Sequence, residues 1–171
     1  DVARAIARNK EGKATAAPKF AELSPGAKRL VRQFEPASKM KYGQFDRNLT
    51  RIKVGGGVKI EDLRAASEFY AREMSIVRDA ETGELFAVMG DEQAILKGHM
   101  KRGDQTLIHT HPVYKTESPG HFGDDIKNAT ERTEAVIDWN GEVTYFNKTG
   151  VIENPTSAQI ESPRRSRCAQ T

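Results

Sequence analysis

Apolar residues recur at helical spacing in two stretches of the first half of the chain. Residues 24–36 open with Ser-Pro, an N-cap followed by a proline at the first helical position, and they end at a second proline. Residues 60–72 carry acidic side chains in their first turn and apolar ones on a single face. The apolar positions are Ala27, Leu30, Val31 and Phe34 in the first stretch, and Leu63, Ala66, Phe69 and Tyr70 in the second. We expect a short basic helix, and then a core helix that packs on a sheet.

Short apolar runs separated by turn residues follow in the second half. Strands are expected at residues 74–77, 85–89, 94–96, 106–108, 135–139 and 142–146. The segment Asp79–Gly83 predicts one hairpin, and Asn140-Gly141 predicts another. A helix is expected over residues 125–132. This pattern indicates an α/β (α+β) fold with a mixed sheet flanked by helices.

Three regions are expected within the 171 residues. Residues 1–59, with the glycine triplet 55–57 at their end, are interpreted as a basic linker and helical extension. Residues 60–154 are expected to form the main domain, and residues 155–171 a loosely ordered tail. No apolar run approaches the roughly 18 residues that a membrane span needs. The start with Asp1 and the lack of a signal sequence favour a fragment of a longer protein or a processed product.

Charge is distributed unevenly along the chain, although its net value is only +3. Residues 1–59 carry 14 Lys and Arg against 5 Asp and Glu, whereas residues 60–171 carry 13 against 19. The basic segment is interpreted as a solvated linker. The alternative is contact with an anionic partner such as nucleic acid.

The segment LIHTHPVYKTESPGHFGDDI contains the strongest chemical signal. His109 and His111 are two residues apart, so a strand would present both imidazoles on one face. A carboxylate at the start of the following helix, Asp124 or Asp125, would add a third ligand and leave a fourth position for water. The single cysteine, Cys168, rules out a cysteine-rich cluster. Zn²⁺ is therefore the expected cofactor, and the alternative is two hydrogen-bonded strand histidines without a metal.

These residues resemble the JAB/MPN (JAMM) metalloproteases. In that family a His-x-His-Pro strand end and a downstream Asp bind zinc, and a serine lies three residues before that Asp. The resemblance covers about residues 60–150 and favours Asp125 as the ligand, with Asp124 as its helix-capping neighbour. It implies a JAB/MPN-like (cytidine deaminase-like) sheet with a basic N-terminal extension. It also implies that Glu73, just before a strand, is the general base.

The sequence departs from the family pattern at the serine. The loop after His111 is two or three residues longer than the usual spacing, and Ser118 is displaced from the serine position by Pro119-Gly120. The serine's usual work is to stabilise charge developing on the substrate carbonyl oxygen. Ser118 could still supply this function by moving inwards, and His121 could act as a donor or an additional ligand.

Within this family, the chain is most similar to JAB-like domains at the C-termini of bacterial polymorphic toxins and Rhs-type effectors. The similarity lies in the hairpin with Thr82-Gly83-Glu84 that leads into His-Thr-His-Pro. It implies a toxin domain that is secreted on a larger protein and acts in the cytoplasm of a target cell. A cognate immunity protein would be its natural partner.

The leading functional expectation is a zinc-dependent hydrolase that cleaves a peptide or isopeptide bond in a protein substrate. Glu73 would accept a proton from water at a metal held by His109, His111 and Asp125. One alternative is a metal-dependent nuclease toxin whose basic N-terminal segment binds phosphates. The other is a catalytically inactive JAMM-like scaffold that retains a binding role.

Overall fold

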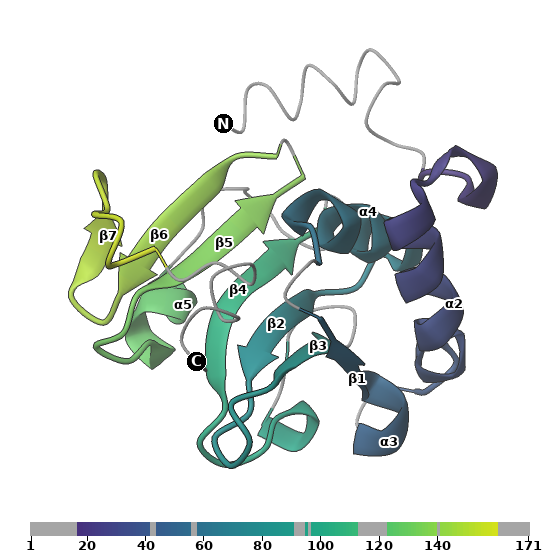
Figure 1. Ribbon diagram of the computed structural model, residues 1–171, viewed down its shortest axis with the longest axis horizontal. Coiled ribbons are helices and arrows are strands. Elements are labelled where there is room, and N and C mark those ends of the chain that lie inside the picture. Colours follow the sequence, from purple (N-terminus) through teal and green to yellow (C-terminus); the bar gives the residue numbers. More distant parts are fainter. Residues whose placement is uncertain are drawn as a thin grey trace.

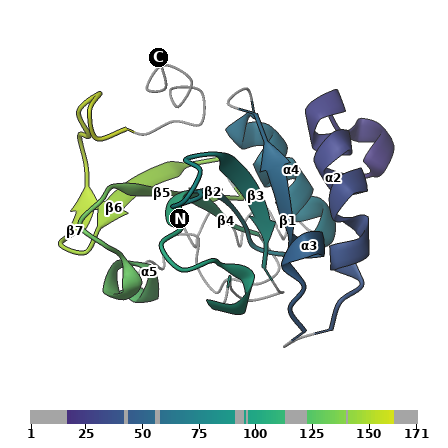
Figure 2. The same ribbon diagram turned by 60° about the horizontal axis from the view of Figure 1, so that its bottom comes forward.

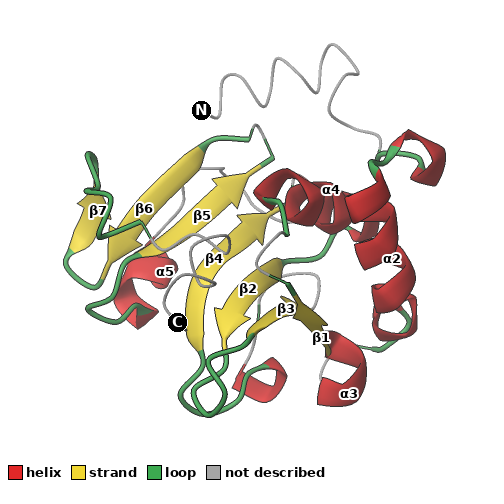
Figure 3. Ribbon diagram, in the orientation of Figure 1, coloured by secondary structure: helices red, strands yellow, loops and turns green. Residues whose placement is uncertain are grey.

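The computed structural model of the chain describes residues 17–41, 44–55, 58–90, 95, 97–112, 123–139 and 141–160. Its helices are η1 (Phe20–Glu22), α2 (Pro25–Ser38), α3 (Arg47–Thr50), α4 (Ile60–Tyr70), η2 (Lys97–His99) and α5 (Gly123–Asn128). Its strands are β1 (Arg51–Val54), β2 (Met74–Arg78), β3 (Leu85–Met89), β4 (Gln105–His111), β5 (Glu134–Asp138), β6 (Val143–Asn147) and β7 (Gly150–Ile152). Helices, strands and loops are distinguished by colour in Figure 3.

All seven strands belong to one mixed sheet with the order β1-β3-β2-β4-β5-β6-β7 (Figure 1). Neighbouring strands are antiparallel except for β4 and β5, which are parallel. A parallel pair needs a crossover connection, because the chain must return to the end of the sheet at which the first strand began. The connection from β4 to β5 contains α5, so this helix is the next element along the chain after the strand that carries the two histidines.

One face of the sheet is covered by α4, and α2 packs on α4 (Figures 1 and 2). The core on this side contains Phe34 of α2 and Leu63 of α4, both with no exposed surface. Strand residues also belong to this core, and within one strand they are two positions apart: Met74, Ile76, Leu85, Ala87, Met89, Ile108, Ala135 and Ile137. The hairpin of β2 and β3 is present, as the apolar runs and the turn between them predicted.

The N-terminal segment contributes to this core, which differs from the expected boundary at residue 59. Helix α2 is present as predicted, but its apolar face is fully buried rather than carried on a separate extension. Strand β1, within the segment interpreted as a linker and helical extension, pairs with β3 from Arg51↔Val88 to Val54↔Leu85. The physical reason is that the edge of β3 and the outer face of α4 need partners, and the preceding residues supply both.

Other elements agree with the sequence in part. Helix α5 ends at Asn128, four residues before the expected end. The hairpin of β5 and β6 is present, and β7 adds an unexpected edge strand. Residues 94 and 96 of an expected strand lie outside the described residues, and Ile95 belongs to no regular element. None of the helices in the described ranges is both long and apolar enough to cross a membrane.

A buried ionic cluster joins the ends of β1, β2 and β4. The Arg51 guanidinium donates two hydrogen bonds to Asp104, at 2.6 and 2.9 Å, and one to Asp79 at 3.1 Å. Asp79 also accepts hydrogen bonds from the backbone N–H groups of Glu81 and Thr82. These bonds organise the turn between β2 and β3 at the end of the sheet opposite the histidines.

Candidate metal centre

The C-terminal half of β4 is held in place by the residue between the two histidines. Thr110 is 1 % exposed, and its hydroxyl accepts a hydrogen bond from Met74 N–H at 3.0 Å. The same hydroxyl lies 2.6 Å from Ser67 Oγ of α4. Because Ser67 donates to the Arg72 carbonyl, Thr110 must be the donor to Ser67. Thr110 therefore faces α4, and the alternation of the strand turns His109 and His111 towards the opposite face.

Asp125 of α5 meets both histidines on that face. Its Oδ2 atom lies 3.4 Å from His109 Nε2 and 3.2 Å from His111 Nε2. The two imidazole Nε2 atoms are 3.1 Å apart. The histidines are 6 and 5 % exposed, and the Asp125 side chain is 26 % exposed, so the carboxylate forms the more open side of the group.

The three atoms have the spacing of metal ligands. Zinc bonds of about 2.0–2.1 Å in tetrahedral geometry place neighbouring ligand atoms roughly 3.3 Å apart. The measured edges of 3.1, 3.2 and 3.4 Å agree with this value. Two imidazole nitrogens and one carboxylate oxygen also suit zinc better than magnesium or calcium, which prefer oxygen ligands. The three residues therefore have the geometry of ligands to one zinc ion.

A second carboxylate contacts the far side of one imidazole. Glu134, the first residue of β5, places Oε1 3.0 Å from His109 Nδ1. This contact lies on the opposite side of the ring from Nε2, so Glu134 is not a ligand to the same ion. Glu134 was not predictable from the sequence, because the contact joins residues 25 positions apart and depends on the pairing of β4 with β5. The only local signal is a glutamate at the start of the next predicted strand.

The electrostatics of the group favour positive charge. Burial alone would lower the pKa of His109, but hydrogen bonds and negative charge from Asp125 and Glu134 outweigh it and raise that pKa to about 10. Burial would raise the pKa of Asp125, whereas the hydrogen bonds from His109 and His111 hold it well below the ordinary value. The two carboxylates thus attract positive charge to this site. Without a metal, that charge is a proton on His109.

Glu73 stands beside the site by strand register. Ser75 of β2 pairs with His109 of β4, and antiparallel continuation by two residues brings Glu73 level with His111. Alternation puts Glu73 on the face of the sheet that carries the histidines. Glu73 is 9 % exposed, and its carbonyl accepts a hydrogen bond from Gly90 N–H at 2.8 Å. Ser75 is itself fully buried, and its hydroxyl has no hydrogen-bond partner among the described residues.

The side chains of the other predicted site residues lie outside the described part of the structure. Asp124 lies in α5, but its side chain is outside the described atoms, whereas the Asp125 carboxylate contacts both histidines. Ser118 and His121 lie outside the described residues.

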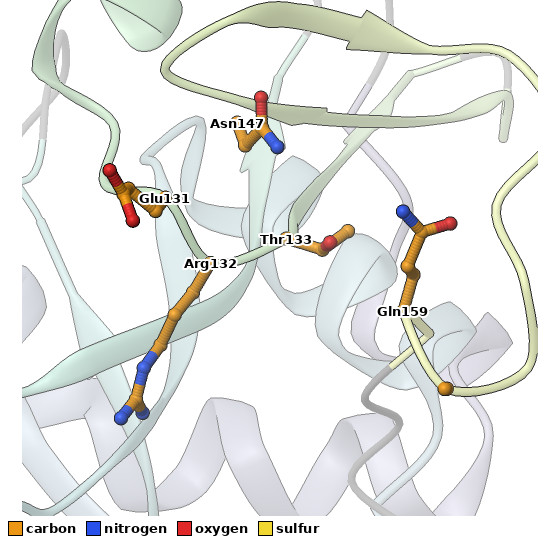
Figure 4. Close-up of a pocket in the computed structure, with 6 residues that line it drawn as sticks. Glu131, Arg132, Thr133, Asn147 and Gln159 are labelled. Atoms are coloured by element: carbon orange, nitrogen blue, oxygen red, sulfur yellow. The ribbon is translucent and has the colours of Figure 1, made fainter.

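A polar pocket of about 300 Å³ lies elsewhere, between the turn before β5, the end of β6 and the turn at residues 156–159 (Figure 4). Its charged side chains have structural partners: Glu131 pairs with Lys148, and Arg132 donates to Gln105. None of the three candidate ligands lines this pocket, so the metal centre is the stronger candidate site.

Comparisons with known proteins identified no relative of the chain. No protein-family model, no curated protein and no solved structure matches the chain.

Proposed function

We propose that the chain is a zinc-dependent hydrolase of the JAMM type that cleaves a peptide or isopeptide bond. The observation that carries the proposal is the close triangle of His109 Nε2, His111 Nε2 and Asp125 Oδ2. A bound zinc ion would lower the pKa of a coordinated water and polarise the substrate carbonyl. The two histidines, nearly buried on a rigid strand, keep the ligand geometry fixed before the ion arrives.

Glu73 is the proposed general base. It would accept the proton of the attacking water and deliver it to the leaving nitrogen, which needs a carboxylate within hydrogen-bonding reach of both groups. Its support is the strand register that brings it level with His111, together with its low exposure.

The proposed fold is JAB/MPN-like. Its support is the order of elements: helix α4, Glu73, the hairpin of β2 and β3, the histidine strand β4, the crossover helix α5, and the hairpin of β5 and β6. We also propose that the domain is the toxin of a secreted bacterial effector, acting in the target-cell cytoplasm and neutralised by an immunity protein. That part rests on sequence resemblance.

Growth of a susceptible bacterium that expresses the chain tests this function. The wild type should stop growth, and Glu73→Gln should not, because an amide cannot accept the proton. Glu142→Gln is the matched control, since it removes the same charge from an exposed position just before β6. This variant should remain toxic. All three proteins must be soluble and carry equal zinc.

Two outcomes would contradict the proposal. Equal toxicity of the wild type and Glu73→Gln would show that Glu73 is not the general base and would favour the nuclease hypothesis. Assays of DNA and RNA degradation would then test that hypothesis. A soluble, zinc-loaded wild type that neither stops growth nor cleaves protein would favour the inactive scaffold.

A further inference from the structure

The contact between Glu134 and His109 lies outside the three-ligand site and needs an explanation of its own. His109 pairs with Val136 across the parallel strands β4 and β5, and Glu134 is two residues before Val136. Alternation therefore puts Glu134 on the same face of the sheet as His109. Its side chain crosses diagonally to the ring and places Oε1 3.0 Å from Nδ1.

This hydrogen bond decides which nitrogen of His109 is available. A carboxylate is an acceptor only, so Nδ1 must carry the proton that it donates. In the neutral ring, the lone pair then belongs to Nε2, the atom that faces His111 and Asp125. The opposite tautomer would break the contact with Glu134 and remove Nε2 as a ligand. Glu134 thus selects the one neutral form of His109 that binds a metal.

The local charge supports the same role. Among the described residues, the ion pair of Glu134 is with His109, and its side chain is 19 % exposed. With neutral histidines, Asp125 and Glu134 give the group a charge of −2, which a divalent cation balances. Glu131, three residues earlier, has a very different setting: its side chain is 80 % exposed and pairs with Lys148.

We propose that Glu134 is a positioning residue for the metal ligand His109, which fixes the tautomer and orientation of the ring and strengthens its bond to the ion. This inference rests on the proposed zinc site and adds to it a residue outside the ligand set. Carboxylates in this position commonly contribute about 10- to 100-fold to metal affinity.

Zinc affinity, measured by competition with a chromophoric chelator, tests the proposal without any enzyme assay. Glu134→Ala should bind zinc about 10- to 100-fold more weakly than the wild type. Glu134→Gln should fall between them, because its amide oxygen still accepts the Nδ1 proton but carries no charge. Glu131→Gln is the matched control and should retain wild-type affinity. Circular dichroism checks folding, and Glu134→Gln decides the matter if Glu134→Ala does not fold.

A spectroscopic readout separates positioning from packing. In the zinc-loaded wild type, the Nδ1 proton of His109 should be protected by Glu134 and give a visible nuclear magnetic resonance signal. In zinc-loaded Glu134→Ala, this signal should be lost through exchange with water. Wild-type affinity in both Glu134 variants would overturn the positioning role and leave the zinc site intact. Wild-type affinity in Glu134→Gln beside a weakened Glu134→Ala would support positioning by the hydrogen bond and overturn the contribution of the negative charge. Failure of the wild type to bind zinc would instead overturn the proposed function.

Discussion

Phe34→Ala tests whether the N-terminal segment belongs to the folded unit. The Phe34 ring has no exposed surface and lies in the same cluster as Leu63 and Met74. Truncation of a buried phenylalanine costs about 3–5 kcal/mol through lost burial and the cavity left behind. Since a domain of this size is stable by about 5–15 kcal/mol, the variant should lose roughly a fifth or more of its stability.

Urea denaturation followed by circular dichroism measures this loss. With a slope of about 2 kcal/mol per molar urea, the midpoint should fall by about 2 M. Gln33→Ala, at the exposed neighbouring position of α2, is the matched control and should change stability by less than about 0.5 kcal/mol. A loss below about 1 kcal/mol for Phe34→Ala would refute the packing of α2 and restore the boundary at residue 59.

Three further outcomes are expected. Zinc binding should release a proton, because the metal-free fold raises the pKa of His109 to about 10. The apparent affinity for zinc should therefore rise about tenfold per pH unit between pH 6 and 9. Zinc titrations that give the same affinity across this pH range would contradict this. Asp79→Asn should cost most stability above about pH 4, because hydrogen bonds from Thr82 N–H and other groups hold the folded pKa of Asp79 below its unfolded value. That cost should shrink as the pH falls below 4, and a constant difference in urea midpoints would contradict it. Thr110→Val should lower stability by about 1–3 kcal/mol, since Met74 N–H loses its partner, and unchanged thermal unfolding would contradict this.

Local patterns predicted much of the fold. The hairpin of β2 and β3 was predictable because its two apolar runs and the turn at Asp79–Gly83 lie within one short stretch. Strand β1 was not, because four residues beside a glycine triplet carry little signal, and their pairing with β3 spans the sequence of α4. Helix α2 was predicted as a helix, but its basic composition concealed how completely one face is buried.

The candidate site divides in the same way. His109 and His111 were predictable from their spacing, and Asp125 from its place at the next helix, because each signal lies within one short segment. Glu134 was not predictable, since its contact depends on which strand lies beside β4. The hydroxyls of Thr110 and Ser67, which hold β4 against α4, also depend on tertiary packing.

Metal content tests the central claim most directly. The full chain, purified without chelator, should contain about one zinc per molecule by elemental analysis, because three ligand atoms lie at zinc-like spacing. The double variant His109→Ala/His111→Ala should be folded and contain none. Absence of a stoichiometric transition metal in the wild type, or equal zinc in the double variant, would contradict the account.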